Sequence, residues 1–202
     1  YDGNLPRVAI TSISKKDFLE KKWSNWSEPK VITPMDVPNK DASIIPEKTE
    51  AGYLFLHRIN DSVCADLLDS LDFDKDKVNR CIELITPRRG MWDGHKVGTA
   101  GPAIKTDAGW LIFYHGVSET GTYRVGAVLL DLKDPTTILA RTAMPLFEPE
   151  EDYEKKGRVS KVIFPCGQVV RKDKIFLYYG GADNIVAVAT LSLSKLLKIL
   201  KW

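Results

Sequence analysis

The chain has 202 residues, of which 44% are hydrophobic and 28% are charged, and its formal net charge is +2. That length can bury one sizeable core but is short for two domains. Charges of both signs alternate without a block of lysine and arginine, so the composition argues against nucleic acid or an acidic membrane as a partner.

Short strands separated by tight polar turns dominate the sequence from its beginning to its end. In chain order, the predicted strands and hairpins are residues 7–12, 29–32, 45–58, 102–115, 124–129, 138–141, 165–180 and 185–190. Helix is expected at residues 17–22 and 194–200, whereas residues 66–77 fit either a helix or an acidic loop. The prediction is an all-β protein with little helix.

Three of these segments repeat one pattern, a strand, a tight turn and an aromatic-rich strand. Gly52 and Gly109 hold matching turn positions 57 residues apart, and Lys174 follows Gly109 by 65 residues. The strands that begin at Arg124 and Ile185 are 61 residues apart, so a second strand type shares the period. This repeat favours a β-propeller; the alternative is an antiparallel sandwich whose hairpins are alike by chance.

At about 60 residues for each unit, the chain would hold about three and a half propeller blades. A ring needs about four blades or more to close, and an open stack leaves strand edges unpaired. We therefore expect residues 1–202 to form one partial β-propeller, whose N-terminal blades are missing or supplied by another chain. The absence of methionine at position 1 favours a truncated chain.

The repeat also predicts which side chains meet, because equivalent positions of successive blades surround a common axis. One position, at the end of the aromatic strand, is held by Arg58, His115 and Gly180. The position before it is held by His57, Tyr114 and Tyr179. Equivalent positions that carry different residues, in a repeat that is otherwise preserved, are typical of a binding site. The alternative is that Arg58 and His115 are hydrogen-bonded polar residues of a sheet.

Two carboxylates lie next to these positions. Asp41 immediately precedes an expected inner strand, where it could serve as a general acid. Asp183 follows Gly180 and Gly181, which would let backbone and ligand approach closely. For each carboxylate the alternative is an ordinary turn residue.

Cationic side chains lie in two further segments. Residues 86–93 combine Arg88 and Arg89 with Trp92, so this loop could bind phosphate or carboxylate and stack on a sugar, or be a plain surface loop. Lys105 follows a glycine-containing segment that lacks the P-loop pattern, and it could add another cation.

The three cysteines, Cys64, Cys81 and Cys166, form no C-x-x-C pair and have apolar neighbours, so we expect buried free thiols in a reducing compartment. With three histidines and no ligand-type spacing, no metal site is expected. No signal peptide or bilayer-length apolar stretch is visible, so the sequence favours a cytoplasmic protein without a membrane partner.

Several segments together resemble glycoside hydrolase family 130, the β-mannoside phosphorylases. They are residues 40–48, 56–58, 98–106, 109–117, 162–167 and 178–183. The resemblance implies a five-bladed β-propeller that cleaves a β-mannoside with inorganic phosphate and inverts the anomeric centre, giving mannose 1-phosphate. It implies no cofactor apart from phosphate as co-substrate, and an oligosaccharide or disaccharide as the other substrate.

The resemblance also implies roles for individual residues. Asp41 is expected to be the general acid, acting directly or through the sugar 3-hydroxyl. Phosphate is expected at Arg58, Arg88, Lys105 and His115, and sugar at Asp183, Tyr114 and His57. The alternatives are a β-mannosidase that uses water, or a sugar-binding propeller without catalysis; homo-oligomer formation is left open.

Overall fold

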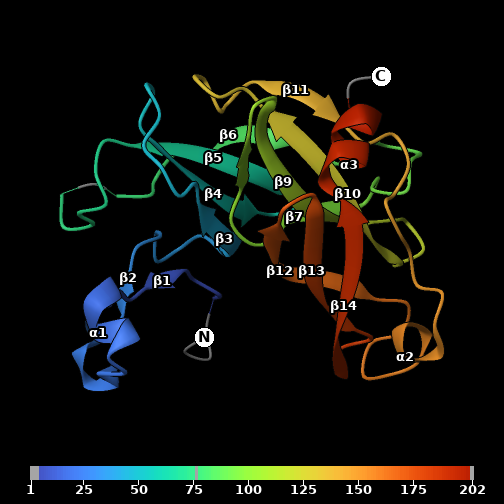
Figure 1. Ribbon diagram of the computed structural model, residues 1–202, viewed down its shortest axis with the longest axis horizontal. Coiled ribbons are helices and arrows are strands. Elements are labelled where there is room, and N and C mark those ends of the chain that lie inside the picture. Colours follow the sequence, from blue (N-terminus) through green and yellow to red (C-terminus); the bar gives the residue numbers. More distant parts are fainter. Residues whose placement is uncertain (1–4, 76, 201–202) are drawn as a thin grey trace.

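The computed structural model describes residues 5–75 and 77–200, and the strands among them form four antiparallel sheets (Figure 1). The first sheet pairs β1 (Ala9–Ile10) with β2 (Lys30–Val31). Between these strands lie α1 (Lys15–Leu19) and a short 3₁₀ helix, η1 (Trp23–Asn25). The helical turn predicted at residues 17–22 is therefore present, and it begins two residues earlier.

Three larger sheets follow, each built from consecutive strands. The first blade has the order β3-β4-β5-β6 and contains β3 (Lys40–Ile44), β4 (Tyr53–Ile59), β5 (Ser62–Leu68) and β6 (Ile82–Ile85). The second blade has the order β7-β9-β10-β11, and β8 also pairs with β9. Its strands are β7 (Lys96–Thr99), β8 (Ile104–Thr106), β9 (Gly109–Val117), β10 (Tyr123–Leu130) and β11 (Ile138–Arg141).

The third blade has three strands, β12 (Ile163–Arg171), β13 (Lys174–Gly181) and β14 (Ile185–Ser192), with α2 (Asp152–Lys155) before it. The predicted C-terminal helix is confirmed as α3 (Leu193–Leu200). Residues 66–77 contain the end of β5 followed by turns, and no helix is found among the described residues of that segment.

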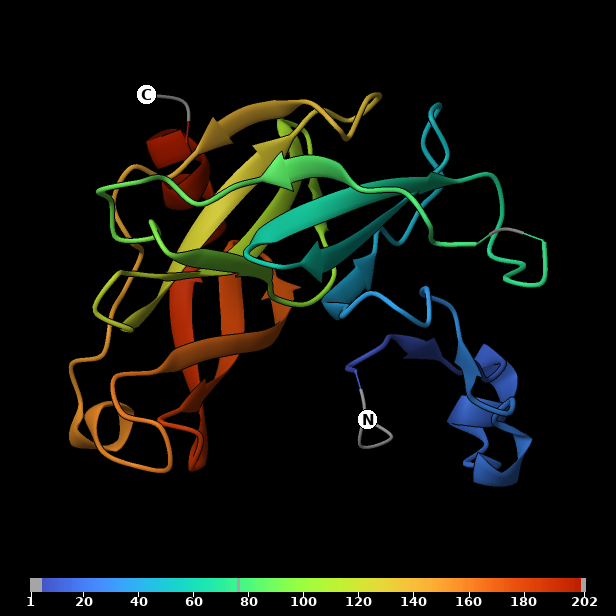
Figure 2. The ribbon, with the colours of Figure 1, turned by 180° about the vertical axis from the view of Figure 1, so that it is seen from behind.

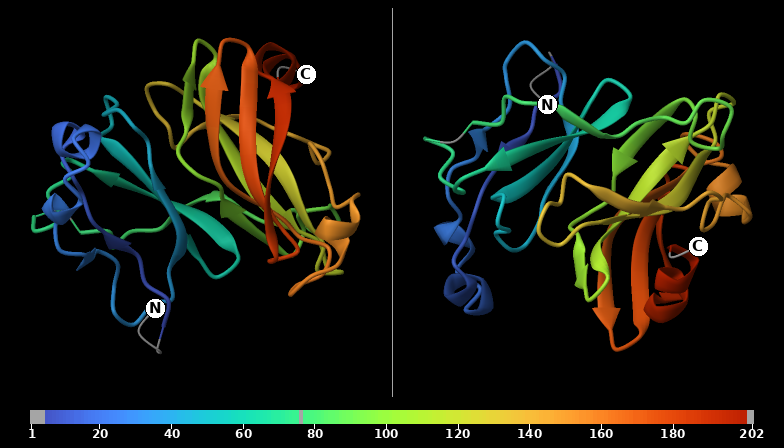
Figure 3. Two further views of the ribbon diagram at one scale, coloured as in Figure 1. Left: turned by 60° about the horizontal axis from the view of Figure 1, so that its bottom comes forward. Right: turned by 90° about the horizontal axis from the view of Figure 1, so that it is seen from above.

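The three blades lie side by side in chain order (Figure 3). The segment with α1 and the third blade lie on opposite sides of the molecule, as the view from behind shows (Figure 2). Both faces of the middle sheet are covered: β7 contacts β3, β4 and β5, whereas β9 and β10 contact β12. A two-layer sandwich would cover one face of each sheet, so this succession of sheets confirms stacked blades.

Strand β9 shows how the sequence produces this stacking, because side chains alternate between the two faces of a strand. Ile112 and Tyr114 join an apolar core shared with the first blade, which includes Leu54. Leu111 and Phe113 join a second core shared with the third blade. Every residue of β9 is buried, so the strand reads as a continuous apolar run rather than as an alternating one.

The prediction of three buried free thiols is wrong. Cys64 on β5 and Cys81 just before β6 form a disulfide, with their Cα atoms 4.8 Å apart. The two residues are 17 positions apart in sequence but lie on neighbouring antiparallel segments, which sequence spacing alone does not reveal. Cys166 is free, and it is exposed rather than buried.

No helix among residues 5–75 and 77–200 is long and apolar enough to cross a membrane. The expected cytoplasmic location is not tested by this finding.

Candidate active site

The site begins with an irregularity in β3, the inner strand of the first blade. The pairing of β3 with β4 shifts between Lys40 and Ser43, so Asp41 lies in a bulge. Its φ angle is 50°, a left-handed conformation that aspartate adopts more readily than most residues. Bulges of this kind redirect a side chain out of the regular alternation. The Asp41 carboxylate is thereby brought to Arg58 on β4.

Asp41 and Arg58 form a partly buried ion pair with unused hydrogen-bonding capacity. Asp41 Oδ2 lies 2.7 Å from Arg58 Nε, with 14% and 12% of the respective side chains exposed. The two atoms are nonetheless not aligned as a hydrogen bond, and neither has another hydrogen-bond partner. Burial raises the pKa of Asp41, while the positive charge of Arg58 opposes that rise. A buried carboxylate and guanidinium with unmade hydrogen bonds are candidates for binding a water molecule or a polar ligand.

His115 on β9 completes the group from the second blade. Its Nε2 lies 3.8 Å from Asp41 Oδ2, and its ring packs 4.5 Å from the ring of Phe164. Only 1% of the residue is exposed, and its Nδ1 has no partner. Burial, together with the charges of Arg58 and Lys96, lowers the pKa of His115 to about 3. His115 is therefore neutral near pH 7 and offers one N–H donor instead of a charge.

Lys96 on β7 is the cation that sequence reasoning missed. Its charge acts on both Asp41 and His115, and its Nζ donates to the Tyr123 hydroxyl at 3.0 Å. The register of β7 on β9 pairs Gly98 with His115 and Lys96 with Val117, which puts Lys96 and Gly98 on one face. Knowledge of that register would have identified Lys96.

Gly98 is where the two blades come closest at this site. A Cβ atom there would lie 2.3 Å from Asp41 Oδ2 and 2.4 Å from His115 Cε1. The neighbouring Thr99 hydroxyl donates to the backbone carbonyl of Asp41. The absence of a side chain at position 98 therefore allows the carboxylate and the imidazole to meet.

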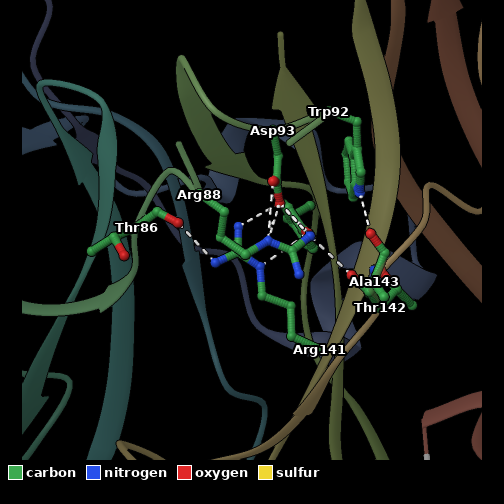
Figure 4. Close-up of polar contacts among 9 residues, drawn as sticks. Thr86, Arg88, Trp92, Asp93, Arg141, Thr142 and Ala143 are labelled. Carbon is green, nitrogen blue, oxygen red and sulfur yellow. Dashed lines mark hydrogen bonds and ion pairs between the residues drawn. The ribbon is translucent and has the colours of Figure 1, made fainter. Parts of the chain in front are cut away.

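The structure gives Arg88 and Tyr114 other partners. Arg88 forms an ion pair with Asp93, whose side chain is fully buried, and the Tyr114 hydroxyl donates to Asp93 Oδ2 at 2.8 Å. Arg141 joins the same carboxylate at 2.6 Å (Figure 4). Burial is the main cause that raises the pKa of Tyr114 well above its ordinary value. These residues form a separate group on the opposite face of β9 from His115.

The three remaining predicted site residues also lie apart from Asp41. His57 is buried, with its ring nitrogens bonded to the Asn39 side chain and to the Arg80 carbonyl. Lys105 is exposed on β8, where it pairs with Glu47. Asp183 is exposed in the turn after β13, with a φ angle of 53°. The structure thus brings together Asp41, Arg58 and His115 and adds Lys96.

No group of three or more histidine, cysteine, aspartate or glutamate side chains that could hold a metal occurs among the described residues.

Comparison with known proteins shows the family of the chain. The model of glycoside hydrolase family 130, described as β-1,4-mannooligosaccharide phosphorylase, matches residues 4–202. The chain belongs to glycoside hydrolase family 130. Its blades are accordingly part of the five-bladed β-propeller of that family, as the resemblance predicted.

Relatives in this family act on mannosides. The chain is 40% identical over 173 residues to a 1,2-β-oligomannan phosphorylase of Thermoanaerobacter sp. (strain X514), covering 86% of this chain and 56% of that protein. The structure of β-1,2-mannobiose phosphorylase from Listeria innocua matches at 36% identity and a TM-score of 0.74, covering 85% of this chain and 48% of that one.

A third similar structure, from a study of family 130 hydrolases that target β-1,2-mannosidic linkages in Candida mannan, matches at 25% identity and a TM-score of 0.79. It covers 96% of this chain and 60% of the other chain. The chain therefore spans about half to three fifths of the length of these three relatives.

We predict that Gly98→Ala disables the site without unfolding the protein. The backbone conformation of Gly98 suits alanine, but the new Cβ would displace Asp41 or His115. A displacement of about 1 Å in an active site costs about a hundredfold in rate. The measurement is the rate of cleavage of a β-mannoside substrate, together with the melting temperature. Gly167→Ala is the control, because a Cβ at Gly167 meets no atom within 4 Å. Equal rates for the two variants would contradict the prediction.

The burial of neutral His115 predicts a specific pH dependence of stability. Its pKa is lowered from 6.5 to about 3 in the folded protein, so unfolding takes up a proton between those values and the free energy of unfolding falls as pH falls. Urea titrations between pH 4 and 6 give the free energy of unfolding at each pH, and this free energy should depend on pH less steeply in His115→Gln, by up to about 1.4 kcal/mol for each pH unit. Parallel pH profiles for the two proteins would exclude this account.

Proposed function

We propose that the protein is a β-mannoside phosphorylase, which transfers a mannosyl unit to inorganic phosphate and releases mannose 1-phosphate with inversion. The observation that carries this proposal is one buried cluster of polar side chains, Asp41, Arg58 and His115, whose hydrogen-bonding capacity is not fully used. Among the described residues, five buried side-chain atoms lack a hydrogen-bond partner, and three of them belong to Asp41, Arg58 and His115. Buried polar atoms of this kind commonly form hydrogen bonds with a bound ligand or water molecule.

The donors at this place suit a phosphate dianion. Arg58 and Lys96 supply positive charge and several N–H donors, and neutral His115 supplies one more. A phosphorylase needs these cations to hold its nucleophile, and it needs no second carboxylate, because phosphate attacks without deprotonation. An inverting hydrolase would instead need a second carboxylate to activate water. Among the described residues, the ion pairs of Arg58 and His115 involve one carboxylate, Asp41.

The reaction forms a bond between a phosphate oxygen and the anomeric carbon, and it breaks the bond from that carbon to the leaving sugar oxygen. The leaving oxygen must take up a proton, for which we propose Asp41 as the source. Inversion puts phosphate and leaving oxygen on opposite faces of the sugar, whereas Asp41 contacts Arg58 on the phosphate side. We therefore propose that the proton passes through a sugar hydroxyl, as the 3-hydroxyl route of the family implies.

Burial of Asp41 assists this role. Its raised pKa keeps the carboxyl protonated to a higher pH than an exposed aspartate would allow, and a bound phosphate anion would raise the pKa further. Catalysis should weaken as pH rises through the pKa of Asp41.

The proposed substrate is a β-1,2-linked mannobiose or oligomannan, since relatives of 40% and 36% identity are named for these substrates. Asp183 keeps its proposed contact with the sugar, and a cytoplasmic location stays a prediction. Because the chain spans only part of its relatives, activity is best measured on the complete natural gene product.

The test offers β-1,2-mannobiose to that protein with and without inorganic phosphate and measures mannose 1-phosphate and free mannose. We expect mannose 1-phosphate only with phosphate, and a loss of at least about a hundredfold in Asp41→Asn. Free mannose formed equally without phosphate would assign a hydrolase, and sugar binding without any product would assign a binding protein.

Asp41→Asn also distinguishes two roles of the carboxylate. If phosphate affinity falls while the rate at saturating phosphate is kept, Asp41 organises the cations and is not the proton source.

The choice between Lys96 and Lys105 gives a matched pair of variants. Lys96→Met should raise the KM for phosphate about tenfold or more, because it removes a charge that acts on Asp41 and His115. Lys105→Met should leave that KM unchanged, since Lys105 is exposed and paired with Glu47. Steady-state kinetics with varied phosphate decides. The reverse ranking would restore the sequence-based assignment of Lys105.

A further inference from the structure

The connection between the first and second blades contains a buried charged group that the proposed reaction does not use. Residues 86–95 run from β6, the outermost strand of the first blade, to β7, the innermost strand of the second. Asp93 lies on this connection with none of its surface exposed. It accepts hydrogen bonds from Arg88 Nη2 at 2.8 Å, Arg141 Nη2 at 2.6 Å and the Tyr114 hydroxyl at 2.8 Å. We call these four residues the interblade clamp; Figure 4 labels Asp93, Arg88 and Arg141.

The two arginines also tie the connection to backbone on both sides. Arg88 Nη2 donates to the Thr142 carbonyl just after β11 at 2.9 Å. Arg141 Nη1 donates in the opposite direction, to the Thr86 carbonyl at 2.7 Å. A third bond runs from Trp92 Nε1 to the Ala143 carbonyl at 2.9 Å. The connection is thereby fastened to the outer edge of the second blade.

Two glycines let the same connection lie flat on the sheet. A Cβ at Gly116 would be 2.4 Å from Asp93 Cβ and 2.5 Å from Trp92 Cζ3. A Cβ at Gly126 would be 2.6 Å from Trp92 Cη2. The Trp92 ring stacks on the Tyr114 ring, with centroids 5.6 Å apart. Gly116 follows His115 in β9, so the connection contacts the strand next to His115, on the face opposite to the His115 side chain.

Stability alone does not account for this arrangement. The desolvation of a buried carboxylate and two guanidinium groups offsets most of their attraction, and apolar side chains of similar volume would stabilise a protein as well or better. Directed hydrogen bonds from three segments do add something that apolar packing lacks, which is one defined position for the connection.

The connection leads directly into two of the site's second-blade residues. The connection ends where the His95 N–H donates to the Val117 carbonyl at 2.9 Å, and Lys96 and Gly98 follow immediately on β7. On its other side β7 touches the first blade, where the Val97 N–H donates to the Asp61 carbonyl at 3.0 Å. Asp41 and Arg58 come from the first blade. The site therefore forms only if β7 is correctly placed between the first blade and the rest of the second blade.

We propose that the interblade clamp is a positioning element, which sets the alignment of β7 between the blades and thereby assembles the cations around Asp41. The part of this inference that concerns phosphate rests on the proposed function. Its residues touch neither the anion nor the sugar, and they act through Lys96 and Gly98.

The test compares Asp93→Asn with Glu154→Gln in the full chain. Both variants replace a buried carboxylate by an amide, and Glu154 lies in α2, bonded to Tyr179 and to backbone N–H groups of its own segment. Hydrogen exchange of the backbone amides is measured for residues 95–99 and for β12 to β14, and phosphate affinity is measured by calorimetry.

We expect Asp93→Asn to speed exchange at residues 95–99 about tenfold more than in the third blade, and to weaken phosphate binding about tenfold. Glu154→Gln should leave phosphate affinity unchanged. Any faster exchange that it causes at residues 95–99 should be no larger than its loss of overall stability explains. Uniform acceleration in all blades, or unchanged exchange at residues 95–99, would overturn the proposal.

Two further arms keep the result decisive. If Asp93→Asn does not fold, Trp92→Phe removes the N–H bonded to Ala143 together with part of the ring that packs on Gly116 and Gly126, and leaves the buried charges in place. It should increase exchange at the same amides; no increase there overturns the proposal. If the unmodified protein binds no phosphate, the proposed function is weakened, while the exchange pattern still decides whether the clamp positions β7.

Discussion

The candidate site depends on the close approach of two blades across one glycine. Asp41 and Arg58 belong to the first blade, His115 and Lys96 belong to the second, and Gly98 lies between the carboxylate and the imidazole with no side chain to separate them. No single blade carries the site. The packing of Leu54 and its neighbours against Ile112 and Tyr114 is therefore a functional requirement as well as a source of stability.

This approach leaves polar groups in an unfavourable state. A buried ion pair that is not aligned as a hydrogen bond, next to an imidazole with an unpaired nitrogen, costs folding free energy. The left-handed backbone of Asp41 adds to that cost. Proteins keep such features where a ligand later supplies the missing partners, and a phosphate dianion supplies acceptors for Arg58, Lys96 and His115 at once.

Much of the fold could be predicted from the sequence, because turn residues and aromatic strands recur with one period. The hairpins at residues 102–115 and 165–180 and the strands that follow them lie where the repeat places them. The disulfide could not be predicted, because Cys64 and Cys81 become neighbours only through the pairing of β5 with the segment leading into β6.

The site was predicted in part for a related reason. Arg58 and His115 hold equivalent positions in successive blades, so the repeat itself brings them to one place. Lys96 lies on β7, and the alignment of the repeated hairpins did not show how β7 pairs with β9. Arg88 looked like a phosphate ligand because of its neighbours in sequence, but its Nε and Nη2 groups donate to Asp93 and to the Thr142 carbonyl. Sequence patterns showed which residue types were available, and the pairing of strands decided which of them meet.

The most direct test of the central claim is a crystal structure of the protein with inorganic phosphate. The account predicts one phosphate between the two blades, within hydrogen-bonding distance of Arg58, Lys96 and His115, with Asp41 beside it. A phosphate bound at Arg88 and Arg141, or at Lys105, or no phosphate between the blades at saturating concentration, would contradict the account.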